Sequence, residues 1–160
     1  MMSLEIGMAI PDIDVHIKDD EGIDTVNMAS FCADKTVALF TVPGAFTPTC
    51  SLKHVPSYLE HYDALVAKGI DAIICLSVND AHVMHAWADD LQTDGKIVMM
   101  ADMQAALSEA LGLAVHMGPV LGTRASRASM VIEKGTIRHL FVEEPMKYEL
   151  SSAEYMLSML

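Results

Sequence analysis

Short apolar runs alternate along the chain with segments whose apolar residues recur at helical spacing. The runs are rich in β-branched residues and too short for a membrane span, so they predict strands buried in a sheet. They cover residues 36–42, 71–78, 97–100, 128–133 and 136–142. Lys134-Gly135 joins the last two runs, which predicts an antiparallel hairpin. Residues 13–17 alternate apolar and polar side chains instead, and predict a short surface strand that turns at 19–22.

Four helices are predicted between and after the strands. The longest covers residues 50–67, is expected to kink at Pro56, and closes at Lys68-Gly69. The other three have start or stop signals in the sequence. They run from a cap at Asn79 or Asp80 to about Leu91, from Ala105 to Leu111 before Gly112, and onward from the capping sequence Ser151-Ser152-Ala153-Glu154.

From residue 36 onward the predicted order of elements is β-α-β-α-β-α-β-β-α. Parallel crossovers come first and an antiparallel hairpin comes last, which is typical of a mixed sheet covered on both faces. We therefore predict an α/β fold with a mixed central β-sheet and helices on both faces. The 160 residues can bury one good core and contain no linker or repeat, so we expect a single domain over residues 1–160.

Composition narrows the classes of partner. The chain is 52% hydrophobic and 20% charged, as in compact globular proteins. Its net charge of −12 argues against nucleic acid and anionic membranes as partners, because no basic cluster is present to neutralise phosphates. No segment reaches the roughly 18 apolar residues of a membrane-spanning helix, and the N-terminus lacks a secretory or transit pattern. We therefore expect a cytoplasmic protein.

The three cysteines, Cys32, Cys50 and Cys75, are too few and too scattered for a disulfide framework. No ligand set with the spacing of a zinc site is present, so no metal and no cofactor are expected. His82 and His85 share a helix face, but without a third ligand they are expected to be surface residues. Cys32 is expected to serve packing alone.

Cys50 occupies an unusual position in the segment Pro43-Gly44-Ala45-Phe46-Thr47-Pro48-Thr49-Cys50-Ser51. A buried strand ends just before this segment and a helix begins at its end, so Cys50 is predicted to lie in the first turn of that helix. The unpaired N–H groups there carry partial positive charge, which favours a thiolate over a thiol, and a thiolate is a nucleophile. The alternative is that Cys50 is a small buried apolar residue, as most free cysteines are.

Residues near Cys50 carry side chains that could contact the sulfur or a substrate. The Thr47 hydroxyl, three residues upstream, is able to donate to a thiolate and to accept from a substrate. Pro43 and Pro48 stiffen the turn. His54 lies one helical turn beyond Cys50, and a Cys–His pair would point instead to acyl transfer.

Two arginines, Arg124 and Arg127, lie three residues apart in a chain with only ten Lys and Arg. A loop arginine is usually just a solvated charge. A thiolate pocket, however, needs a cation that cannot lose its proton, and a guanidinium fork is able to hold both oxygens of a peroxide.

The segment from Pro43 to Ser51 resembles the peroxidatic-cysteine motif of peroxiredoxins. Its PGAFTP form, followed by Lys53-His54-Val55-Pro56, is similar to the peroxiredoxin-5 (type-II) subfamily. Two further stretches match that subfamily in the same order along the chain. They are residues 77–81 together with Trp87, and residues 122–130.

The resemblance implies a thioredoxin-like fold and a thiol peroxidase that reduces hydrogen peroxide and alkyl hydroperoxides. It places the peroxidatic cysteine on Cys50, which would be oxidised to sulfenic acid. The substrate-binding threonine falls on Thr47, the shielding proline on Pro43 and the active-site arginine on Arg127, with Arg124 as the rival. The family carries a histidine at the position of His54 without using it as a base.

The resemblance also bears on how the enzyme is regenerated. Residues 149–153 contain no cysteine, so the C-terminal resolving cysteine of some relatives is missing. Cys75 remains a candidate resolving residue, but it lies in a predicted buried strand, and a Cys50–Cys75 disulfide would require the first helix to unwind. Otherwise an external thiol, glutathione with glutaredoxin or thioredoxin, is expected to reduce Cys50.

A homodimer is implied as well, with Phe46 and Trp87 as candidate contacts. Two other functions stay open from the sequence: a redox-sensing or relay module that passes Cys50 oxidation to a partner protein, and an inactive binding domain of thioredoxin fold.

Overall fold

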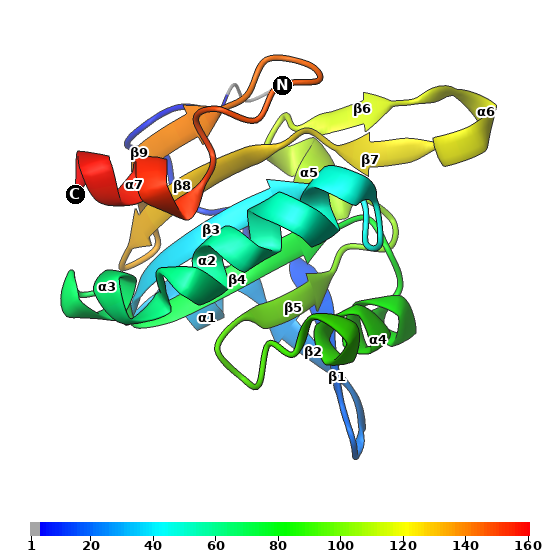
Figure 1. Cartoon of the computed structure of the whole chain (residues 1–160), viewed down its shortest axis with the longest axis horizontal. Coiled ribbons are helices and arrows are strands. Elements are labelled where there is room, and N and C mark those ends of the chain that lie inside the picture. Colours follow the sequence, from blue (N-terminus) through cyan, green and yellow to red (C-terminus); the bar gives the residue numbers. More distant parts are fainter. Residues whose placement is uncertain (1–3) are drawn as a thin grey trace.

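A computed structural model describes residues 4–160, which form layers of helices around a central seven-stranded sheet (Figure 1). The strand order is β2-β1-β5-β4-β3-β8-β9. The strands are β1 (Asp14–Asp19), β2 (Gly22–Asn27), β3 (Thr36–Val42), β4 (Ala72–Ser77), β5 (Val98–Ala101), β8 (Ala128–Glu133) and β9 (Thr136–Val142). Strands β3, β4 and β5 run parallel to one another, whereas β1, β2, β8 and β9 add antiparallel pairings. The prediction of a mixed sheet is confirmed.

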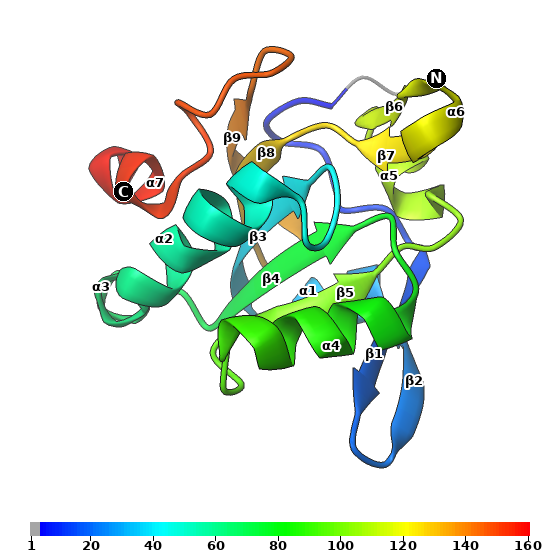
Figure 2. The ribbon, with the colours of Figure 1, turned by 45° about the vertical axis from the view of Figure 1, so that its right-hand side comes forward.

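Helices cover both faces of the sheet, as predicted (Figure 2). They are α1 (Met28–Cys32), α2 (Val55–Glu60), α3 (Tyr62–Ala67), α4 (Ala81–Leu91), α5 (Ala106–Ala110), α6 (Gly118–Leu121) and α7 (Ala153–Met159). Side chains of β3 alternate between the two faces because successive residues of a strand point in opposite directions. Phe40 joins the core under α2 and α4, whereas Leu39 joins the core beside α1 and α5.

The predicted 50–67 helix is interrupted twice. Residues Cys50–His54 form a π-helical turn, in which the Val55 N–H donates to the Cys50 carbonyl. This turn ends two residues before Pro56, which has no N–H and whose ring crowds the preceding turn. The predicted Pro56 distortion therefore takes the form of a π-turn ahead of the proline. A second break, which the sequence did not predict, falls at His61 between α2 and α3.

Several elements were not predicted from the sequence. β2 carries little apolar signal because none of its residues is buried, and it pairs with β1 along its whole length. α1 is a single short turn capped by the Asn27 side chain. Between Leu113 and Arg127, the chain forms a separate two-stranded sheet of β6 (Ala114–His116) and β7 (Thr123–Ala125), with α6 at its tip. Within the described residues, no helix has the length and apolar character needed to cross a membrane.

Candidate active site

Cys50 lies at the point where the chain leaves the sheet and enters the α2 layer. β3 ends at Val42, and a loop of residues 43–47 leads into the helical turn that contains Cys50. The Asn79 side chain, which follows β4, accepts a hydrogen bond of 3.0 Å from the Ala45 N–H and so ties this loop to the neighbouring strand end. The Cys50 side chain is fully buried. The predicted first-turn position of Cys50 is therefore confirmed.

Arg127 contacts the Cys50 sulfur directly. Its Nη2 donates to Cys50 Sγ at 3.2 Å. The register of the sheet explains this contact, because β8 pairs with β3 so that Ala128 lies opposite Thr41. Arg127, one residue before Ala128, therefore emerges at the end of the sheet where the Cys50 loop begins. A guanidinium donor at this distance stabilises a thiolate over a thiol.

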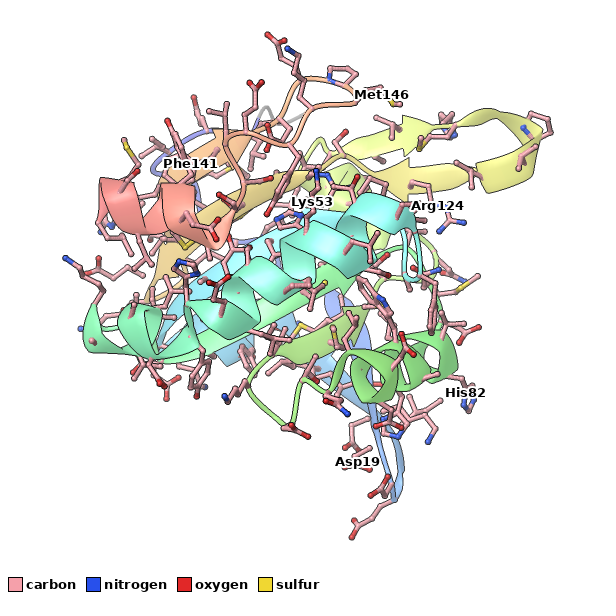
Figure 3. All side chains as sticks on the ribbon, in the orientation of Figure 1. Asp19, Lys53, His82, Arg124, Phe141 and Met146 are labelled. Atoms are coloured by element: carbon pink, nitrogen blue, oxygen red, sulfur yellow. The ribbon has the colours of Figure 1, made fainter. Side chains whose placement is uncertain are left out.

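Arg124 points to a different place. Its Nε donates to the Leu121 carbonyl at 2.8 Å, and its Nη1 lies 2.8 Å from where a Cβ on Gly44 would be. Figure 3 shows Arg124 at β7, beside the loop that precedes the Cys50 helix. The structure thus brings Arg127, and not Arg124, to the cysteine.

Thr47 and Pro43 line the same loop. The Thr47 hydroxyl donates to the Gly44 carbonyl at 2.7 Å rather than to the sulfur, so its oxygen lone pairs are left to accept from a ligand. Pro43 is half-buried. Gly44 is closely packed, since an added Cβ would lie 3.2 Å from Thr47 Cγ2 and would displace the tip of Arg124.

Trp87 packs against the site from α4. Its indole Nε1 donates to Ser51 Oγ at 2.9 Å, and its ring lies 6.3 Å from that of Phe46, measured between centroids. Trp87 is fully buried, whereas Phe46 is 52% exposed. The expectation that Trp87 contacts a partner subunit is therefore wrong for this side chain, because its surface is already covered by its own fold.

His54 is held between two groups that fix its protonation. Its Nε2 lies 2.9 Å from the Ser151 carbonyl and its Nδ1 lies 2.7 Å from Arg127 Nη1. Burial, reinforced by the charge of Arg127, lowers the His54 pKa from 6.5 to about 3. The ring is therefore neutral at physiological pH, and its single proton must be on Nε2 because a carbonyl only accepts and a guanidinium only donates.

This arrangement argues against a Cys–His pair for acyl transfer, because both His54 nitrogens have partners other than the sulfur. The position of His54 near Cys50 is evident in the sequence, whereas its contact with Arg127 is not. The one available signal was the spacing of four residues from Cys50.

The lowered pKa of His54 predicts a pH dependence of stability. Between pH 6.5 and about 3 the unfolded chain binds a proton on His54 that the folded chain does not bind. The free energy of unfolding therefore falls as the pH falls through this range, by on the order of 1 kcal/mol per pH unit from this group. We expect His54→Phe to flatten that part of the profile in urea unfolding experiments. The matched control His82→Gln, at an exposed position, should leave it unchanged, and an equally steep profile in His54→Phe would contradict this assignment.

The other two cysteines are held as thiols. All three cysteines are free and buried. Burial raises the Cys32 pKa to about 11. Burial raises the Cys75 pKa well above 9, and the neighbouring Cys50 raises it further. Cys75 lies on β4 opposite Phe40, within the core beneath α2. Cys50 and Cys75 belong to the same buried core cluster, so whether a disulfide between them needs the helix to unwind stays a prediction.

The described residues offer one group of three side chains with metal-ligand atoms close together: Glu60, His61 and Glu154, within 4.8 Å of one another. Both glutamates are exposed, and such surface groups commonly hold no ion. His82 is exposed, and His85 approaches the carboxylates of Asp20 and Asp89 at 3.6 and 3.8 Å. The Cys50 site contains a sulfur, an arginine, a hydroxyl and a neutral histidine, which suits thiol chemistry.

Comparison with known proteins agrees with this chemistry. A family model described as Redoxin matches residues 5–157. The chain is 40% identical to the chloroplastic Peroxiredoxin-2E-2 of Oryza sativa subsp. japonica, over 99% of this chain and 73% of that protein. It is 36% identical to Peroxiredoxin-2B of Arabidopsis thaliana over the whole of both chains. The chain belongs to the peroxiredoxin family.

Solved structures extend the likeness of this peroxiredoxin to its fold. The crystal structure of reduced Prx3 from Vibrio vulnificus in complex with H2O2 is 39% identical, with a TM-score of 0.95 over 98% of both chains. Peroxiredoxin 5 from Alvinella pompejana is 30% identical, with a TM-score of 0.85 over 97% of this chain and 96% of that one. The fold is therefore thioredoxin-like and the subfamily is type II, as the resemblance of the sequence motifs implied. The activity is that of a thiol-dependent peroxidase.

Proposed function

We propose that Cys50 is the peroxidatic nucleophile and that Arg127, Thr47 and Pro43 form its peroxide-binding site. The observation that carries this proposal is the 3.2 Å contact between Arg127 Nη2 and Cys50 Sγ. Through this contact, the Cys50 sulfur has a permanent cation as its hydrogen-bond donor. Neither Cys32 nor Cys75 has such a partner among residues 4–160. The whole of residues 1–160 acts as one peroxidase domain in this proposal.

The first reaction step follows from the charges. The Cys50 thiolate attacks the terminal oxygen of hydrogen peroxide or an alkyl hydroperoxide, so an S–O bond forms as the O–O bond breaks. The departing hydroxide or alkoxide takes up a proton and leaves as water or an alcohol. Arg127 meets the charge that develops on the oxygens, and Thr47 accepts from the peroxide O–H. Sulfur is oxidised to sulfenic acid and the peroxide is reduced.

The second step needs an external thiol. We propose glutathione with glutaredoxin, or thioredoxin, as its source. One thiol attacks the Cys50 sulfenic acid and releases water, giving a mixed disulfide. A second thiol then releases Cys50 and takes the disulfide away. This one-cysteine cycle is supported by the buried, protonated state of Cys75.

Peroxide consumption tests the cycle when it is measured separately with dithiothreitol, with glutathione and glutaredoxin, and with thioredoxin and its reductase. Turnover with at least one of them supports the proposal. If no reductant sustains turnover while Cys50 is still oxidised by peroxide, the alternative of a sensor or relay module replaces it.

Replacing Cys75 by serine is expected to leave turnover with glutathione and glutaredoxin within about twofold of the unmodified protein. Surrounding packing should tolerate the change at some cost in stability, because a buried hydroxyl needs a partner. Steady-state peroxide consumption measures the effect, with Cys32→Ser as the matched control. A loss of turnover in Cys75→Ser alone would identify Cys75 as the resolving residue.

We also propose a homodimer in the cytoplasm. The exposed ring of Phe46 and the exposed Leu121 near the Cys50 loop support an apolar contact there. The three free cysteines are in keeping with a reducing compartment, although some relatives carry chloroplastic or mitochondrial names. Sedimentation equilibrium tests the dimer, and Phe46→Asp should shift the protein towards the monomer.

A further inference from the structure

The segment that connects β9 to α7 lies over the active-site helix, by which we mean the π-turn Cys50–His54 together with α2. Residues 143–152 form neither helix nor strand, yet their two ends are close to the sheet and to α2. Figures 1 and 2 show this segment descending from β9 to α7 on the side where α2 lies. Its tip points away from the protein, since Met146 is 98% exposed and projects outward in Figure 3. The segment therefore contacts the rest of the protein at its base, where its two ends lie.

A buried carboxylate holds that base in place. Glu143 follows β9 directly and is only 7% exposed. Its Oε2 accepts from three consecutive backbone N–H groups and from one hydroxyl, at 2.7 to 2.9 Å. The donors are the N–H groups of Glu149, Leu150 and Ser151, and the Ser151 Oγ. Successive N–H groups that converge on one oxygen form an anion-binding nest, and such charge-assisted bonds are about twice as strong as neutral ones.

The residue held by this nest supplies the partner of His54. The Ser151 carbonyl accepts from His54 Nε2 at 2.9 Å and from the Tyr58 hydroxyl at 2.9 Å. This acceptor keeps the His54 proton on Nε2 and so leaves Nδ1 free to accept from Arg127 Nη1. If the carbonyl moved away, the proton could shift to Nδ1, where it would face the Arg127 donor and repel it.

The same segment contacts Arg127 in two further ways. The Glu143 N–H donates to the Arg127 carbonyl at 3.0 Å. The Tyr148 ring lies under the guanidinium, 5.7 Å from Arg127 Cζ to the ring centroid, and the Tyr148 hydroxyl donates to the Lys53 carbonyl at 3.3 Å. Lys53 is labelled in Figure 3 on the active-site helix, next to this segment.

We propose that Glu143 is a positioning residue for the peroxide reaction. Through the Ser151 carbonyl and the neutral His54 ring, it keeps the Arg127 guanidinium aimed at Cys50. Glu143 touches neither sulfur nor peroxide in this proposal, which rests on Cys50 and Arg127 having the roles proposed above. The chain of contacts is Glu143 to Ser151, Ser151 to His54, His54 to Arg127, and Arg127 to Cys50.

The variant Glu143→Gln tests this role with little change of shape. The amide oxygen is able to replace Oε2, and the amide nitrogen takes the place of Oε1, which has no hydrogen-bond partner within residues 4–160. The charge is lost, so the hold on residues 149–151 weakens. We expect the second-order rate of Cys50 oxidation by hydrogen peroxide to fall about tenfold, and further in Glu143→Ala. The single tryptophan, Trp87, lies beside Ser51 and reports this step by fluorescence in rapid mixing.

Two comparisons separate positioning from a general loss of stability. The matched control is Glu144→Gln, which removes the same charge from the next, exposed residue and should change the rate less than twofold. The second is a double-mutant cycle with His54→Phe, which keeps a ring but removes both nitrogens. If Glu143 acts through His54, Glu143→Gln should slow the His54→Phe protein by less than twofold, whereas independent effects would multiply.

The proposal is overturned if Glu143→Gln oxidises Cys50 at the unmodified rate, or if its effect multiplies fully with that of His54→Phe. Either result, with Cys50→Ser inactive, removes the role of Glu143 and leaves the active-site assignment intact. A Cys50→Ser protein that still reduces peroxide would show instead that the assignment itself has failed.

Discussion

Cys50→Ser is expected to abolish peroxide reduction with every reductant. Serine retains the shape of cysteine, but a hydroxyl is not ionised at neutral pH and its oxygen cannot cycle through a sulfenic acid. Loss of the attacking atom in other nucleophilic enzymes costs rates of up to about 10⁶-fold, so we expect a loss of at least about 10⁴-fold here. Peroxide consumption measured with dithiothreitol as reductant gives this number directly.

The matched controls for this change are Cys32→Ser and Cys75→Ser. Both of these thiols are buried and have raised pKa values, so neither should replace Cys50 as nucleophile. We expect both controls to retain peroxide reduction with dithiothreitol. Substantial turnover in Cys50→Ser would transfer the nucleophile to another residue and contradict the site described above.

Arg127→Ala is expected to have the second largest effect, slowing Cys50 oxidation by about 10²- to 10³-fold. Removing one donor that stabilises developing oxyanion charge typically costs this much. The substitution also takes away the hydrogen bond to Cys50 Sγ and leaves His54 Nδ1 without its donor. Arg127→Lys should recover only part of the rate, because an ammonium group cannot bond to sulfur and to His54 with the geometry of a planar fork.

Arg124→Ala is the control that this structure supplies. Arg124 bonds to the Leu121 carbonyl and touches the Gly44 loop, so its loss should slow oxidation by less than about tenfold. Rapid-mixing measurements of Cys50 oxidation compare the two variants under the same conditions. A larger loss in Arg124→Ala than in Arg127→Ala would show that the other arginine serves the peroxide.

Much of the fold could be predicted because its strands have clear local signals in the sequence. The hairpin of 128–133 and 136–142 was predicted at its observed bounds, since β-branched runs flank a Lys-Gly turn. The start of α4 was predicted as Asn79 or Asp80, and the structure assigns the cap to Asp80, whose side chain accepts from the Val83 N–H. Asn79 is used instead to hold the Ala45 loop.

Other elements could not be predicted because their stability comes from distant pairing. No residue of β2 is buried, and its place depends on β1. The π-turn at Cys50 could not be predicted either. Pro56 indicated a distortion of the helix, but periodicity alone does not distinguish a kink from a widened turn.

The residues proposed to bind peroxide could be predicted from local pattern and resemblance, whereas the residues that hold Arg127 in place could not. Cys50, Thr47 and Pro43 lie in one short segment, and Arg127 directly precedes β8, which pairs with β3. His54, Ser151 and Glu143 meet across as many as 97 positions in sequence, through a backbone carbonyl that carries no signal in the residue type. Such contacts become visible only when the chain is folded.

The assignment of Cys50 as the nucleophile is tested by locating the oxygen atom that the protein takes from peroxide. The fully reduced protein is mixed with one equivalent of hydrogen peroxide, trapped with dimedone, digested and examined by mass spectrometry. Dimedone reacts with sulfenic acid but not with methionine sulfoxide, so the 13 methionines do not obscure the result. We expect the adduct on Cys50; an adduct on Cys32 or Cys75 with Cys50 unmodified would show that the nucleophile is a different cysteine.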